Sequence, residues 1–364
     1  MPSPIAASRT LLLGVLAFAL APVAVRAESS GAPPAEATTM ETVEVIARVT
    51  GPGLWEVRQG DNVLWVLGTQ SPLPRRFEWV SDEVDARLAE SSLLIAPPTV
   101  SFAADIGRFR ALTLLPSLLR ARRNPDERRL EEVVGPELYA RWQPLKQRYL
   151  GRNRKVETWR PLFAAIKLWE EAIEDARMTG SGPVWRAVSK SAKKLKLPVE
   201  TPKVAVSIAD PRDSIRSFAR SPLDDLECFS RTLERLETDI EAMRERADAW
   251  AVGDLETLRA LPFSDQNRAC QDAFLSASVG EQNHITDVPE RLREAWLDSV
   301  DKALAEHRSS VAVISIGSLL DPETDLLGHL QRRGYRVRAP DEARATDAEL
   351  LAPALEAASG AQRP

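Results

Sequence analysis

Residues 53–74, with the sequence GLWEVRQGDNVLWVLGTQSPLP, limit the possible folds of this chain more than any other stretch. Trp55 and Val57 alternate with polar residues, which is the period-2 pattern of a half-buried strand. Residues 63–67 are a continuous apolar run, as in a strand that is buried on both faces. The polar sequence Gln59-Gly60-Asp61-Asn62 separates the two. The stretch therefore predicts a β-hairpin whose second strand lies inside a sheet.

Further apolar runs predict more strands, at residues 92–96, 203–208, 311–315 and 335–338. Between them, apolar residues recur every three or four positions, which predicts amphipathic helices. Among these helices are residues 81–89, 102–122, 137–150, 159–177, 222–250 and 289–305. Asp321 and Pro322 predict the start of a further helix, and Gly334 its end. The pattern predicts an α/β fold, in which a central mixed sheet made of these strands is flanked by helices, with a largely helical insertion over residues 102–300.

The N-terminus has the layout of a secretory signal peptide. Arg9 precedes an apolar run at residues 11–21, and Val25-Arg26-Ala27 is a suitable cleavage site. The run is shorter than the ~20 residues that a membrane span needs, and an uncleaved signal anchor is the alternative. We expect a signal peptide at 1–27, a disordered linker at 28–41, a single domain at 42–340 and a flexible tail at 341–364.

Removal of the signal peptide would move the formal net charge from −5 to −7, because Arg9 and Arg26 leave with it. A mildly acidic exported protein is a poor candidate for binding nucleic acid. No later segment is apolar enough to span a membrane, so we expect a periplasmic or extracellular protein. Because export exposes Cys228 and Cys270 to an oxidising compartment, a disulfide between them is predicted. Two independent buried thiols are the alternative.

Four features of the chain resemble the TraB/GumN family. They are the GLWEV hairpin, the Gly68-Thr69 turn after it, the Trp159-Arg160-Pro161 helix start and the closing unit that ends in Gly334-Tyr335. The resemblance extends over about residues 51–340. It implies an α/β fold related to a metal-hydrolase scaffold. Some relatives are metal-dependent proteases or esterases, whose chemistry needs histidine and carboxylate ligands around one ion.

The chain departs from that resemblance at three positions. Ser71 stands where the family motif GT-x-H has histidine, and Ala96 stands where a carboxylate ends the next strand. Ser318 or Leu319 occupies the place of the second histidine. A neutral hydroxyl binds zinc poorly at pH 7, and alanine and leucine supply no donor atom. The resemblance thus implies a degenerate, metal-free pocket without cofactor, lined by Gly68, Thr69, Gln70, Ser71, Ala96, Ser315, Gly317, Ser318 and Leu319.

Other candidate catalytic groups are scattered. The three histidines, His284, His307 and His329, stand at no motif position and show no metal-ligand spacing. We expect His329 on a helix surface. A serine nucleophile at Ser71 or Ser318 would need a neighbouring base, which no motif supplies.

A lysine run is read as a solvated helix face, with contact to an anionic polymer as the alternative. Its members are Lys190, Lys193, Lys194 and Lys196.

Two hypotheses for function remain from different classes. The first is an exported, non-catalytic binding or accessory protein whose polar pocket takes a small molecule, a peptide or an envelope protein. The second is a metal-dependent hydrolase whose catalytic residues lie outside the motif positions. A purely structural role is a third, weaker option.

Overall fold

The structure is a computed structural model that describes most of the chain from Arg48 onwards. The described residues are 48–104, 114, 116–117, 119–208, 210–220, 224–238, 240–261, 269–270, 273 and 287–342. All of them belong to one unit, residues 46–364. The predicted signal peptide and linker, His284 and nearly all of the predicted tail lie outside the described residues, so those expectations stay predictions.

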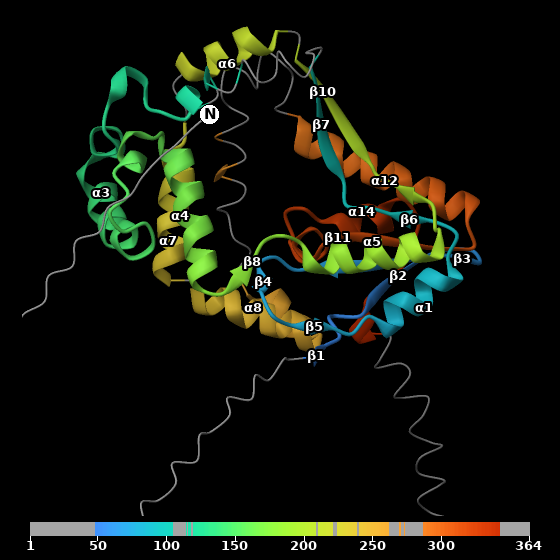
Figure 1. The fold of residues 1–364 in the computed structure, drawn as a ribbon. Helices are drawn as coiled ribbons and strands as arrows, with labels where there is room; N and C mark the ends of the chain where they lie inside the picture. Colours follow the sequence, from blue (N-terminus) through green and yellow to red (C-terminus); the bar gives the residue numbers. More distant parts are fainter. Residues whose placement is uncertain are drawn as a thin grey trace, which may run out of the picture. The chain divides into compact units, whose positions relative to one another are not determined.

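A six-stranded mixed sheet forms the centre of the fold (Figure 1). Its order is β12 (Arg336–Arg338), β2 (Leu54–Gln59), β3 (Asn62–Thr69), β11 (Ser309–Ser315), β6 (Leu94–Ile95) and β9 (Val199–Glu200). The first three strands are antiparallel, and β3, β11, β6 and β9 are parallel. The α/β class and the mixed sheet are thereby confirmed. Gln59 lies opposite Asn62, so the predicted hairpin closes through Gly60 and Asp61.

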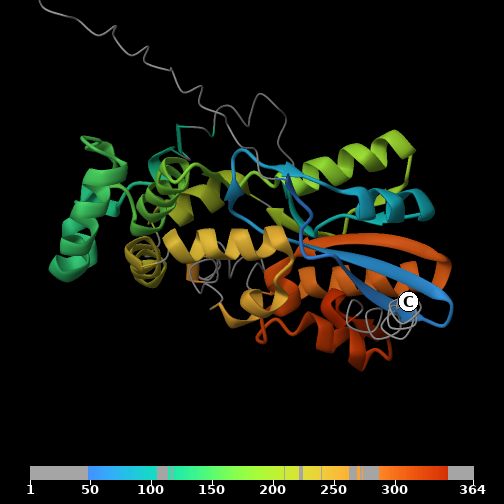
Figure 2. The same cartoon turned by 90° about the horizontal axis from the view of Figure 1, so that it is seen from below.

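Helices cover both faces of this sheet, as Figure 2 shows. Helices α1 (Asp82–Glu90) and α5 (Pro183–Leu195) lie on one side, and α12 (Val288–Glu306) and α14 (Leu326–Arg332) lie on the other. The central strands are buried from both sides because their residues are apolar on both faces. Fully buried examples are Leu64, Val66, Leu94, Ile95, Ala312 and Val313.

The prediction that residues 203–208 join the central sheet is wrong. Strand β10 (Lys203–Ile208) pairs in parallel with β7 (Thr99–Ala104) in a separate two-stranded sheet. The central sheet contains β9 in its place. Pro97 and Pro98 separate β6 from β7, and Pro202 separates β9 from β10. Because proline has no N–H to donate, these residues interrupt the ladder between the two sheets.

Three predicted helices have different bounds in the structure. The helix predicted at 137–150 is part of α3 (Leu130–Tyr149), which begins earlier. Phe102 belongs to strand β7, opposite Val206, so no helix begins there, and the described helical residues of this segment lie between 114 and 121. Residues 222–250 hold two helices, α7 (Leu226–Thr238) and α8 (Ile240–Val252). These two helices pack into different cores: Leu233 of α7 contacts the helical core, and Trp250 of α8 contacts the core around the sheet.

The helical core lies between α3 (Leu130–Tyr149), α4 (Pro161–Asp175) and α7. The rings of Trp142 and Phe229 are 5.4 Å apart there. Cys228 of α7 is fully buried and forms a disulfide with Cys270, with an S–S distance of 2.02 Å, which confirms the predicted pairing. That these helices are an insertion into the fold stays a prediction.

The closing unit is only partly as expected. Asp321 and Pro322 do not start the predicted helix: α13 (Ile316–Leu320) precedes them, and α14 begins at Leu326. The Asp321 carboxylate instead accepts hydrogen bonds from Glu323 N at 3.0 Å and Thr324 Oγ1 at 3.1 Å, which stabilise a turn. Gly334 follows the last helical turn with φ +87°, as predicted.

The remaining elements are short. They are β1 (Arg48–Val49), β4 (Leu73–Pro74), β5 (Glu78–Trp79), β8 (Met178–Thr179), α6 (Pro211–Arg220), α9 (Leu255–Ala260) and the 3₁₀ turns Pro125–Glu127 and Lys155–Thr158. Within the described ranges, no helix combines the length and apolar content that a bilayer crossing requires.

Candidate functional site

The C-terminal ends of β3 and β11 bring most of the predicted pocket residues together. Thr69 lies directly opposite Ser315 in the parallel pair, and its Oγ1 donates to Ile314 O at 3.1 Å. Helix α13 starts at the next residue, which places Gly317, Ser318 and Leu319 at the same edge of the sheet. This edge is where α/β folds bind ligands.

Gly68 is enclosed by apolar side chains. A Cβ at this position would lie 3.1 Å from atoms of Trp55, Ile316 and Leu319, which is closer than ordinary packing allows. The carbonyl of Gly68 accepts a hydrogen bond from the indole of Trp250 at 2.8 Å. Indole and apolar side chains therefore occupy the space beside Gly68, and Leu319 is 4% exposed.

Gln70 and Ser71 continue the chain beyond β3. Gln70 is buried, and its side-chain amide donates a hydrogen bond to Ser71 O at 3.1 Å. The amide is therefore used within the loop that follows β3. Ser71 is exposed. The loop then enters β4, which pairs with β8. Ser71 thus lies at the rim of the predicted pocket.

Ala96 follows β6, the neighbour of β11 on the side away from β3. It is 2% exposed, and its N–H donates to Glu200 O at 2.8 Å. Strand β11 therefore separates Ala96 from Thr69. A carboxylate at this position would follow β6, which is separated from β3 by one strand. Alanine offers only a methyl group there.

Of the two described histidines, His307 lies at the opposite end of β11 and His329 lies in α14. His307 ends α12, at the start of β11, and its Nδ1 lies 2.7 Å from Ser92 Oγ. His329 lies in helix α14, as expected, but its side chain is half-buried and not fully on the helix surface. Among the residues that the structure describes, no three His, Cys, Asp or Glu side chains are placed to share a metal ion.

The residues at the predicted pocket do not fit a catalytic metal. Such a site takes three protein ligands with nitrogen, sulfur or charged oxygen donors. Ser71, Ala96 and the residues of α13 offer at most neutral hydroxyls. The arrangement can donate and accept hydrogen bonds, and its own side chains supply no charge to hold a cation or to move a proton.

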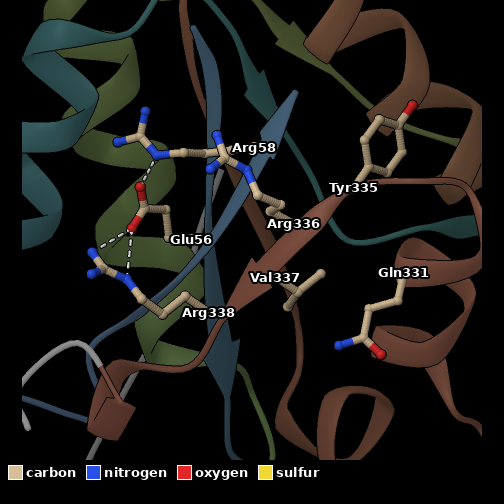
Figure 3. A pocket seen from close by; sticks show the side chains of 7 residues that line it. All are labelled: Glu56, Arg58, Gln331, Tyr335, Arg336, Val337 and Arg338. Atoms are coloured by element: carbon tan, nitrogen blue, oxygen red, sulfur yellow. Dashed lines mark hydrogen bonds and ion pairs between the residues drawn. The ribbon is translucent and has the colours of Figure 1, made fainter. Parts of the chain in front are cut away.

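A different surface feature, which sequence reasoning missed, lies along the edge strand β12. A groove of about 720 Å³ runs there (Figure 3), lined by Glu56, Arg58, Gln331, Tyr335, Arg336, Val337 and Arg338. Glu56 is 6% exposed, and its Oε2 accepts hydrogen bonds from Arg338 Nε at 3.0 Å and Nη2 at 2.6 Å. Its Oε1 accepts from Arg58 Nε.

These contacts set the charge state of Glu56. Burial disfavours the ionised carboxylate, but hydrogen bonds and ion pairs with Arg58 and Arg338 outweigh it and hold the pKa of Glu56 below its ordinary value. Glu56 and Arg338 are 282 residues apart. The sequence signal for the groove was the alternation of charged with apolar residues in both strands, Glu56 and Arg58 in β2 and Arg336 and Arg338 in β12.

The structure is a mixed-sheet α/β protein in which the carboxyl ends of β3 and β11 carry neutral side chains. The TraB/PrgY/gumN family model matches residues 53–339, and the chain belongs to this family. No curated protein and no solved structure matches the chain significantly. The family expected from the sequence motifs is thereby confirmed.

Proposed function

We propose that this chain is an exported, non-catalytic member of the TraB/PrgY/gumN family that acts as a binding or accessory protein. One observation carries the proposal: Ser71, Ala96 and Ser318 or Leu319 stand where the family resemblance expects histidine, acid and histidine. Losing one ligand leaves a weak metal site, whereas losing all three leaves no charge to offset dehydration of the ion.

The geometry around these positions supports the same proposal. The Thr69 hydroxyl, the Gln70 amide and the Gly68 carbonyl all have partners inside the protein. Ser71 and Ser315 are exposed and Ser318 is half-buried, so these hydroxyls at the rim are the groups that a ligand meets. A small molecule, a peptide or an envelope protein would be held there by neutral hydrogen bonds.

Three measurements test the non-catalytic proposal. The mature protein, purified from the extracytoplasmic fraction, should contain no stoichiometric metal, and a chelator should leave its thermal midpoint unchanged. It should hydrolyse neither peptides nor esters. A peptidase or esterase activity that chelation removes and added metal restores would contradict the proposal. Sequencing of the N-terminus tests export, since cleavage after Ala27 should leave Glu28 first.

One contact favours a hydrolase with off-motif residues as the second candidate. Ser92 is exposed, and its Oγ lies 2.7 Å from His307 Nδ1, which is the distance expected between a nucleophile and its base. No carboxylate hydrogen bond to this imidazole is found among the described residues, and Ser92 Oγ also lies 3.4 Å from Ser309 O. Covalent labelling by a fluorophosphonate that Ser92→Ala abolishes would support this candidate, and unlabelled wild-type protein would exclude this serine.

A further inference from the structure

The groove along β12 contains a cluster of three arginines with a single carboxylate among them. Cross-strand register places Arg336 directly opposite Arg58, and Arg338 directly opposite Glu56. Because side chains alternate along a strand, Arg336 and Arg338 point to the face that carries Glu56 and Arg58, and Val337 points to the other. Figure 3 shows the guanidinium groups of Arg58 and Arg338 on the Glu56 carboxylate, and the Arg336 side chain on the strand opposite Arg58.

Glu56 holds two of these guanidinium groups in place but uses few of their donors. It binds Nε of Arg58, and Nε and Nη2 of Arg338. Both terminal nitrogens of Arg58 and Nη1 of Arg338 have no partner among the described residues, and neither has any nitrogen of the Arg336 side chain. The cluster carries a local charge of three arginines against one glutamate, on a chain whose formal net charge is −5.

Charge repulsion makes this arrangement costly without a ligand. Like charges directly opposite each other in an antiparallel pair destabilise a sheet. Asp301 and Glu294 of α12 do not relieve this repulsion, because each already has a partner. Tyr335 OH donates to Asp301 at 2.7 Å, and Arg333 Nη2 lies 2.7 Å from Glu294. Charged residues on an edge strand can also serve to block sheet aggregation, but that role requires no buried carboxylate to orient them.

We propose that Arg58, Arg336 and Arg338 form a binding site for a phosphoryl group. Guanidinium groups present planar, paired donors that match phosphate oxygens, and two or three of them together suit a dianion better than a single carboxylate. The excess of two positive charges balances the charge of about −2 that a phosphate monoester carries near pH 7. Glu56 orients Arg58 and Arg338 so that their outer nitrogens stay available. This site lies outside the pocket of the proposed function and does not depend on it.

Titration of the full-length mature protein with inorganic phosphate, at constant ionic strength and with chloride as the reference anion, tests the site. Saturable binding is expected, and Arg336→Gln should weaken it by about tenfold or more, because charged hydrogen bonds to the anion are lost. Since the Arg336 side chain binds no other described residue and lies opposite Arg58, this variant should fold with a thermal midpoint at or above that of the wild type. Arg336→Lys should bind at an intermediate level, because it keeps the charge without the planar fork.

Arg231→Gln is the matched control, since it removes the same charge from the solvent-facing side of α7, where Arg231 pairs with Glu234 at 3.3 Å. Equal phosphate binding by Arg336→Gln and Arg231→Gln would overturn the proposal, as would a wild-type protein that binds neither phosphate nor vesicles. A second arm separates two sources of the phosphoryl group. Sedimentation with phosphatidic acid vesicles that is lost in Arg336→Gln would support a lipid headgroup. Binding of phosphate without vesicle binding would support a soluble phosphate ester.

Discussion

Replacement of Asp225 by alanine should destabilise the helical core, because this carboxylate is buried where α4 and α7 begin. Asp225 is 3% exposed, and its Oδ2 accepts a hydrogen bond from Leu162 N at 2.8 Å, in the first turn of α4. Its own carbonyl accepts from Phe229 N at 3.0 Å, which starts α7. A residue 63 positions after Leu162 therefore caps α4.

The expected loss has two parts. The lost cap costs about 1 kcal/mol. The larger part comes from Arg160, which is 2% exposed and attracts Asp225 by its charge. Breaking a buried charge pair from one side costs about 3–5 kcal/mol, so together with the cap we expect about 4–6 kcal/mol in total for Asp225→Ala. Asp225→Asn keeps an acceptor for Leu162 N and should lose about 1 kcal/mol less.

Burial raises the pKa of Asp225, against the opposing effects of the Leu162 hydrogen bond and the Arg160 charge, and burial also lowers the pKa of Arg160. Both pKa shifts favour the neutral form, so for each residue the cost of burying its charge outweighs the attraction between Arg160 and Asp225. The double variant Arg160→Met/Asp225→Asn should therefore lose less stability than the sum of the two single variants. Urea unfolding followed by far-UV circular dichroism measures the wild type, Asp225→Ala, the single variants Arg160→Met and Asp225→Asn, and the double variant. A loss below about 1 kcal/mol for Asp225→Ala, or additivity within about 0.5 kcal/mol, would refute the reasoning.

Three further outcomes follow from the packing and the charges. Gly68→Ala should cost about 1–3 kcal/mol in unfolding free energy, because its methyl group would meet three side chains at 3.1 Å. Gly180→Ala, whose nearest contact would be 3.7 Å, should change it little and serves as the control. Reduction of the Cys228–Cys270 bond, with a sequence separation of 42, should cost on the order of 3–4 kcal/mol, and unchanged urea unfolding after reduction would contradict this. The pKa of Glu56 is lowered from its ordinary value of 4.5, so its ionised form stabilises the fold fully at pH values above 4.5. This contribution is lost as the pH falls through the lower pKa of the folded state. Glu56→Gln should therefore flatten the acid limb of stability against pH, and an unchanged limb would exclude the effect.

Local patterns in the sequence were sufficient for several elements. Alternation and the two-residue loop determine the β2–β3 hairpin, because both strands and their turn lie within 16 residues, from Leu54 to Thr69. Pro161 at the first position of α4 and Gly334 after α14 act on neighbouring backbone only, so their effect is independent of the rest of the chain. The family motifs likewise placed Thr69 and Ser315 at one edge, because the carboxyl ends of parallel strands coincide.

Only the tertiary structure decided which distant segments meet. Periodicity shows that a strand has an apolar face but not which strand lies beside it, so the pairing of β10 with β7 rather than within the central sheet was not predictable. The same holds for Asp225 at the start of α4 and for Glu56 between Arg58 and Arg338. Each contact depends on long-range packing that no local pattern encodes. The side chains at Ser71, Ala96 and Ser318 could be read from the sequence, whereas the enclosure of Gly68 by Trp55, Leu319 and Trp250 required the folded chain.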